Sequence, residues 1–248
     1  MLVAAAVCPG PPLLVPAVAA GAAPELDAAR AACADALGVL AAARPDRLIV
    51  IGPAEPDRRG EHPSGTTGSF RGFGVDLDVV LDTDTDTDTA AADAGAGESP
   101  GRELPVSLAV AAWLLEHTHW TAAPVSGLGV GEPLDTERCL RTGRGIAAGD
   151  GRLALLVMGD ASACRSLKAP GYLDERAAGF DEEAARALGT ADVAALKALD
   201  AELAYALKAA GRAPWQVLAG AAEGAGLGGE LLYEAAPYGV GYLVAAWS

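Results

Sequence analysis

Histidine and cysteine, the side chains that most often hold transition metals, are scarce in this sequence. The 248 residues include 3 histidines and 4 cysteines. The cysteines are far apart and none belongs to a CxxC pair, which disfavours a tetrahedral zinc site built from them. Without a secretory context we expect reduced thiols rather than disulfides. The four are Cys8, Cys33, Cys139 and Cys164.

Basic residues are also in the minority. Lys and Arg number 18 against 33 Asp and Glu, which gives a formal net charge of −15. A field of this sign repels phosphate groups and anionic lipid heads. Neither nucleic acid nor a membrane surface is therefore an expected partner.

Long apolar runs are absent as well. The apolar opening, residues 1–23, is interrupted by four prolines, and no Lys or Arg precedes Arg30, so it lacks the form of a secretory signal. No stretch reaches the roughly 18 uninterrupted apolar residues that a membrane-spanning helix requires. We therefore expect a cytoplasmic protein.

The sequence does contain enough apolar material for one layered domain, with 51% hydrophobic and 21% charged residues. Residues 2–8, 47–52 and 153–158 are short apolar runs typical of strands buried on both faces. An apolar stripe from Pro24 to Arg44 indicates a helix between the first two, and hence a βαβ unit with parallel strands. The prediction is a single α/β domain, residues 1–248, with a central mixed or mainly parallel sheet flanked by helices on both faces.

Weaker patterns predict the other elements. Further helices are expected at 103–117, 134–148 and, with Thr190 capping one of them, between about 175 and 225; further strands are expected at 75–81, 122–126, 230–234 and 240–247. Residues 53–74 indicate a loop, and the glycines of 127–131 favour a tight turn over a dinucleotide-binding loop. The run DTDTDTDTAAADAGAGESPGR, residues 82–102, indicates a flexible acidic loop, with weak cation binding as the alternative.

Chemistry in open α/β sheets collects at the carboxyl ends of the strands. The loops after Cys8, Gly52, Met158 and Tyr233 should therefore share one cleft if the sheet is parallel. The residues expected to line this cleft are Pro9, Gly10, Pro11, Ala54, Asp160, Ser162, Ala163 and Glu234, with Tyr238 nearby. Asp160 suits the capping of a backbone turn as well as ligand binding.

Several motifs occur in an order that resembles one known family. They are VCPGPPLLVP, RLIVIGP, FRGFGVD, VMGDASACRS, APGYLDERAAGFD and LLYEAAPYGVGYLVAAW, and together they span nearly the whole chain. In this order the chain resembles the catalytic B subunit of class III extradiol ring-cleavage dioxygenases, whose wider superfamily includes the Memo-like proteins. The nearest resemblance is to a branch from high-GC bacteria.

The resemblance implies an Fe(II) site made of two histidines and a carboxylate, with a further histidine as acid and base. In this sequence the two metal histidines are replaced by Gly10 and Ala54, and the acid/base histidine by Ala163. Only the carboxylate has a counterpart, Glu234, as a possible remnant ligand. The family's chemistry should therefore fail, and no cofactor is expected. We expect a catalytically degenerate protein that binds a small aromatic or other small molecule, or assembles with itself or a second subunit.

A second hypothesis is an active metal-dependent oxygenase or hydrolase with a relocated centre. His62, in the predicted loop, would swing into the cleft and join Asp160 and Glu234; a solvated loop histidine is the alternative. His117 and His119 are expected at a helix end, where the helix dipole favours their charge. Cys164 has no histidine near it in sequence to act as a base, so a packed or loosely exposed thiol is expected.

Overall fold

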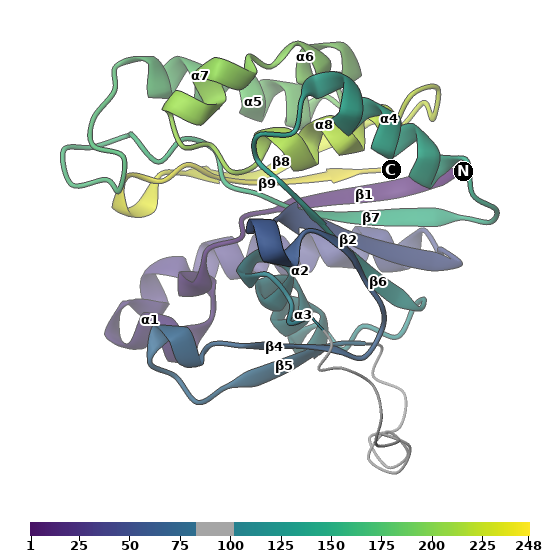
Figure 1. Ribbon diagram of the computed structural model, residues 1–248, viewed down its shortest axis with the longest axis horizontal. Coiled ribbons are helices and arrows are strands. Elements are labelled where there is room, and N and C mark those ends of the chain that lie inside the picture. Colours follow the sequence, from purple (N-terminus) through teal and green to yellow (C-terminus); the bar gives the residue numbers. More distant parts are fainter. Residues whose placement is uncertain (83–101) are drawn as a thin grey trace.

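A seven-stranded sheet runs through the middle of the molecule in the computed structural model, which describes residues 1–82 and 102–248 (Figure 1). The strands occur in the order β3-β6-β2-β7-β1-β9-β8. Neighbours from β6 to β1 pair in parallel, and β3, β9 and β8 are joined to the sheet by antiparallel pairs. The strands are β1 (Leu2–Cys8), β2 (Arg47–Pro53), β3 (Gly60–His62), β6 (Val125–Val130), β7 (Leu153–Met158), β8 (Gly229–Ala235) and β9 (Tyr242–Trp247).

Helices cover both faces of this sheet. In Figure 1 one layer holds α2 (Asp27–Ala42), α3 (Val106–His117) and a separate hairpin of β4 (Thr66–Ser69) and β5 (Asp78–Leu81). The short α1 (Pro16–Ala19) belongs to the same side. The other layer holds α4 (Thr136–Ala147), α5 (Arg176–Gly189), α6 (Val193–Ala198), α7 (Ala201–Ala206) and α8 (Arg212–Ala221). The chain thus has the α/β fold that the sequence predicted, with a mixed, mainly parallel sheet.

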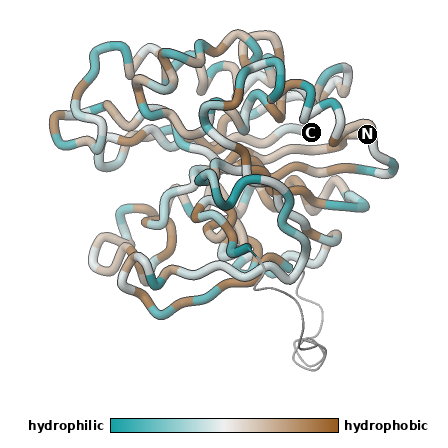
Figure 2. The backbone as a smooth tube through the Cα atoms, viewed as in Figure 1, coloured by the Kyte–Doolittle hydropathy of each residue, from teal (hydrophilic) through white to brown (hydrophobic). Residues whose placement is uncertain are grey.

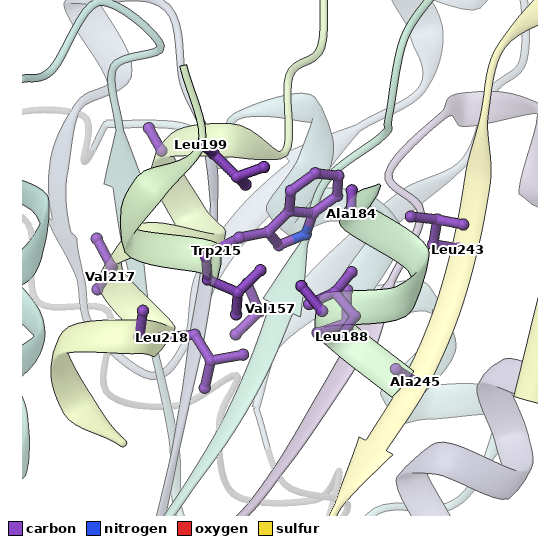
Figure 3. Close-up of a cluster of buried hydrophobic side chains, with 14 of the residues drawn as sticks. Val157, Ala184, Leu188, Leu199, Trp215, Val217, Leu218, Leu243 and Ala245 are labelled. Atoms are coloured by element: carbon purple, nitrogen blue, oxygen red, sulfur yellow. The ribbon is translucent and has the colours of Figure 1, made fainter. Parts of the chain in front are cut away.

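The core has two halves, one on each face of the sheet. In β7 the side chains of Leu155 and Val157 pack toward α5 and α8, whereas those of Leu156 and Met158 pack toward α2 and α3. Figure 2 shows hydrophobic residues along the central strands and alternating with hydrophilic residues in the helices around them. Figure 3 shows the first half, where the fully buried Trp215 of α8 lies among aliphatic side chains of α5 and the sheet.

The glycine-rich segment 127–131 was predicted to be a tight turn. This prediction is wrong, because most of the segment belongs to strand β6. A Cβ at Gly127 would lie 2.6 Å from Leu108 Cδ2, and one at Gly129 would lie 2.6 Å from the carbonyl oxygen of Arg58. Glycine is needed here because α3 and the loop before β3 approach the strand closely. The glycines of this segment therefore indicate close packing against the strand rather than a turn of the chain.

Several predicted boundaries also differ from the structure. Residues 53–74 contain the short strands β3 and β4, which the loop interpretation missed. The helix expected from Pro24 begins as α2 at Asp27, after a 3₁₀ segment. Asp192, and not Thr190, caps α6, by accepting a 3.0 Å hydrogen bond from the Ala195 N–H. The predicted acidic loop, 82–102, lies almost wholly outside the described residues.

Within residues 1–82 and 102–248, no helix has the length and apolar character that crossing a bilayer would need.

Candidate functional site

The loops predicted to converge lie at one edge of the sheet, which we call the carboxyl edge because β1, β2, β7 and β8 all end there. The strands β2, β7 and β1 are neighbours and parallel. β8 and β1 each pair antiparallel with β9, so β8 also ends at this edge. The loops after these strands hold Gly10, Ala54, Asp160 and, at the end of β8, Glu234.

Asp160 joins two of these loops. Its Oδ1 accepts a 2.9 Å hydrogen bond from the Gly10 N–H, 150 residues away in the sequence. Burial raises the pKa of the Asp160 carboxyl to about 6, and the Gly10 hydrogen bond offsets part of this effect. In the described part of the chain the second carboxylate oxygen has no hydrogen-bond partner. Asp160 thus links the loops after two strand ends.

Gly10 and Ala54 are partly exposed at the same edge, near the start of α3. The Ser107 hydroxyl at this helix end donates a 2.7 Å hydrogen bond to the carbonyl of Pro53, and the Ala54 N–H donates one of 2.8 Å to the carbonyl of Val130. A Cβ at Gly10 would lie 3.5 Å from Ser107 Cβ, an ordinary contact. Space alone therefore does not require glycine at this position. Pro9 and Pro11 flank it in the loop.

Ser162 does not line an open cleft, in contrast to the prediction, because it is fully buried. Its N–H and hydroxyl donate hydrogen bonds of 2.7 and 2.9 Å to the Asp181 carboxylate of α5, which also accepts one of 2.9 Å from Arg165. Ala163 is 9% exposed and Cys164 is buried. This network fixes the loop after β7 against α5, and so Ser162 has a structural contact for each of its donors.

His62 is neither a solvated loop residue nor a cleft residue, so both of its predicted positions are wrong. It lies on β3, 1% exposed, with Nε2 2.8 Å from the carbonyl oxygen of Arg58. Strands β6 and β2 separate β3 from β7, so three strand spacings of about 4.8 Å each lie between His62 and the strand that leads to Asp160.

Glu234 lies at the carboxyl edge but faces the other side of the sheet from Tyr242. It pairs with Leu243, whose side chain packs in the half of the core that contains α5 and α8. Directly opposite residues of an antiparallel pair lie on the same face of the sheet, so Glu234 lies on the side of α5 and α8. Tyr242 and Val244 alternate with Leu243 along β9 and therefore lie on the α2 side. Among the described residues no group of three or more His, Cys, Asp or Glu side chains is placed to hold a metal ion. The structure therefore does not bring His62, Asp160 and Glu234 together.

Sequence reasoning missed Tyr242, the first residue of β9. It is 1% exposed, and its pKa is raised by burial first and then by the neighbouring Asp160, Tyr238 and Tyr233. In the part of the chain that is described, the Tyr242 hydroxyl makes no hydrogen bond. The sequence did offer a signal for this residue, namely a tyrosine at the start of an otherwise apolar strand. Such a tyrosine marks a position for a polar contact, since a buried phenol usually has a polar partner.

The two remaining histidines lie at the opposite edge of the sheet. His117 is the last residue of α3, as predicted, and its ring stacks on Trp113 with centroids 4.0 Å apart. His119 follows in a turn and lines a hollow of about 160 Å³ between the end of α2 and the segment before β6. Neither histidine is near the carboxyl edge.

Comparisons with known proteins bear on the fold. No protein-family model matches the chain, and a search of curated proteins finds no match. Among solved structures, the chain is similar to the uncharacterized protein JW3007 from Escherichia coli K12, with 15% sequence identity, 99% of each chain covered and a TM-score of 0.53. A likeness at this level of identity shows a shared fold and no more.

Proposed function

We propose that this chain is a catalytically degenerate relative of the catalytic B subunit of class III extradiol dioxygenases, and that it binds a small molecule at the carboxyl edge without holding iron. One observation carries the proposal. The neighbouring strands β2, β7 and β1 lead into the loops of Ala54, Ala163 and Gly10, which stand where the resemblance places three histidines.

None of these three side chains has an atom that can bind a metal or move a proton. The facial triad that holds Fe(II) in such enzymes needs two imidazoles beside a carboxylate, and Asp160 alone would leave iron bound mainly by water. The loss of a general acid/base typically costs about 10²- to 10⁴-fold in rate. The side chains that remain at this edge suit binding better than ring cleavage.

The cysteines fit a reducing compartment, and we infer that the protein is cytoplasmic. All four are free and buried. The neighbouring Cys33 thiol of α2 and burial raise the pKa of Cys8 in β1. Two neighbouring thiols would be prone to oxidation in a secreted protein.

Anoxic titration of the full chain with Fe(II), followed by metal analysis and a catechol cleavage assay, tests the proposal. We expect less than stoichiometric iron and no ring-opened product. A characterised extradiol dioxygenase in the same assay serves as the positive control. One equivalent of iron together with ring opening would refute the proposal.

A further inference from the structure

Exposed hydrophobic side chains gather on the outer side of the loop that follows β7. Among the described residues eight large hydrophobic side chains are exposed; three of them belong to residues 165–175 and a fourth lies on α7. We call these four the loop patch: Leu167 (63% exposed), Tyr172 (62%), Leu173 (46%) and Tyr205 (69%). Single exposed hydrophobic residues are normal on a surface, whereas a group of them marks an interaction site.

The loop and the end of α7 are in contact. Lys208 Nζ donates a 3.4 Å hydrogen bond to the carbonyl of Pro170, and a Cβ at Gly171 would lie 3.3 Å from Lys208 Cδ. The Lys208 N–H in turn donates a 3.1 Å hydrogen bond to the carbonyl of Tyr205. The four hydrophobic residues therefore come from two segments that pack against each other at one end of the helical layer (Figure 1).

Backbone hydrogen bonds hold this loop against the chain that leaves β7. The Gly171 N–H donates to the carbonyl of Ala163 at 2.8 Å. The Asp174 N–H donates to the carbonyl of Cys164 at 3.0 Å. Between them Tyr172 has a φ of 62°, in the left-handed region that costs a non-glycine residue about 1 kcal/mol or more. The fold thus exposes Tyr172 at an energetic cost, and a surface that is already ordered loses little entropy when a partner binds.

The charges around the loop patch suit contact with an identical surface. Lys168, Lys208, Glu175 and Glu202 are all exposed, and none of the four forms an ion pair within residues 1–82 and 102–248. A partner with charges of one sign would meet like charges here as well as opposite ones. In an interface with a two-fold axis the same patch meets itself, so the cations of one copy can face the carboxylates of the other.

The area of the loop patch is also in the range for such a contact. Its two leucines and two tyrosines expose on the order of 400 Å² of side-chain surface, given roughly 150–250 Å² for a whole aromatic side chain. One side of a stable protein interface buries about 800 Å². The patch therefore supplies about half of one side, as the apolar centre of an interface whose rim is charged.

We propose that a second copy of this chain docks on the loop patch and that a two-fold axis relates the two copies. The net charge of −15 repels copies from one another, so association is expected where cations interrupt the acidic surface. Of the three lysines in the chain, two lie here, at positions 168 and 208. The inference goes beyond the proposed function, because it concerns the outer side of the loop after β7 and does not depend on whether iron is bound.

Sedimentation velocity of the full chain over a wide concentration range, about 1 to about 300 µM, tests this inference. The salt concentration is about 150 mM, at which charge repulsion between copies is screened over about 8 Å. The variants Leu167→Asp and Tyr172→Ala lie in the patch. Val80→Asp is the matched control, because it places the same new charge at an exposed aliphatic residue of β5, in the other layer.

We expect a monomer–dimer equilibrium with a dissociation constant in the micromolar range, at the weak end for protein interfaces. Leu167→Asp and Tyr172→Ala should each raise this constant about tenfold or more, as the loss of a central contact does. Val80→Asp should change it less than about twofold, as expected of a remote exposed charge. Circular dichroism of each variant checks that these exposed substitutions leave the fold intact.

A monomer at every concentration would overturn the inference, and so would a dimer that Leu167→Asp and Tyr172→Ala leave intact. Equal weakening by Val80→Asp would also overturn it, because the added charge and not the patch would then be the cause. A monomer that sediments with neutral lipid vesicles, and loses this binding in Leu167→Asp, would assign the patch to a membrane surface instead. None of these results bears on iron uptake, so the proposed function is tested separately.

Discussion

At the scale of single residues, Asp160 lies in the candidate site at an energetic cost to the fold. Burial raises the pKa of its carboxyl to about 6, above the ordinary value of about 3.9 for an aspartate side chain. The folded state therefore binds this proton more tightly than the unfolded state, and the free energy of unfolding falls as the pH rises from about 4 to about 6. Above that window the ionised carboxyl destabilises the fold by up to about 3 kcal/mol, and by less where solvent reaches it.

Asp160→Asn should therefore stabilise the protein at pH 7.5 and leave its stability nearly unchanged at pH 4, because asparagine keeps the Gly10 hydrogen bond without the charge. Denaturant unfolding at the two pH values measures the difference, for which we expect about 1–3 kcal/mol. Glu234→Gln, which removes an exposed carboxylate from the same edge of the sheet, is the control and should change the stability little at either pH. A variant that is less stable than the wild type at pH 7.5 would contradict this account of Asp160.

At the scale of elements, α4 and α8 pack through glycines. A Cβ at Gly143 of α4 would lie 2.0 Å from the carbonyl oxygen of Val217, and one at Gly220 of α8 would lie 2.2 Å from that of Leu140. Both obstacles are backbone atoms, so the helices would have to move apart. Gly145, on the exposed side of α4, has no atom within 4 Å of its would-be Cβ.

Gly143→Ala should lower the free energy of unfolding by about 2–3 kcal/mol, the usual cost of overpacking. Gly145→Ala, two residues away in the same helix, should raise it by about 0.5–1 kcal/mol through helix propensity. Denaturant titration of both variants checks the pair. Equal effects in the two would show that the helices do not depend on this close approach.

The elements also show what the sequence could predict. Strands β1 and β7 were predicted to the residue, because a run of apolar side chains buried on both faces has few other interpretations. Strand β6, Val125–Val130, was predicted too early, at 122–126, because its glycines, which serve contacts distant in sequence, were interpreted as a turn. The short β3 was missed because its three residues, Gly60–His62, carry no alternation to detect.

The candidate site was predicted only in part, because the sequence rule used for it fixes the edge of the sheet but not the face on which a side chain lies. The rule for parallel sheets brought Gly10, Ala54 and Asp160 to one edge, and the structure places them there. The rule says nothing about which face a side chain takes, so it could not separate Glu234 from Tyr242. It also gave no means to place His62 on an edge strand.

At the scale of the whole molecule, the layered fold is shared with a protein of 15% identity, so the fold alone does not decide the function. The function depends on the side chains in the loops at the carboxyl ends of the strands. Here the charge of −15 and the Asp160 carboxyl, which has no ion-pair partner in the part of the chain that is described, favour cations at the carboxyl edge. The binding of iron, more than any feature of the core, separates a degenerate enzyme from an active one.

The most direct measurement of this claim is the iron content of the wild type and of Gly10→His/Ala54→His after the same anoxic Fe(II) titration and desalting. A Cβ at Gly10 would meet only ordinary contacts, and Ala54 is partly exposed. We predict that the double variant retains iron at least about tenfold more tightly than the wild type and than either single variant, because two imidazoles beside a carboxylate complete a facial triad. A wild-type protein that retains one equivalent of iron would contradict the account.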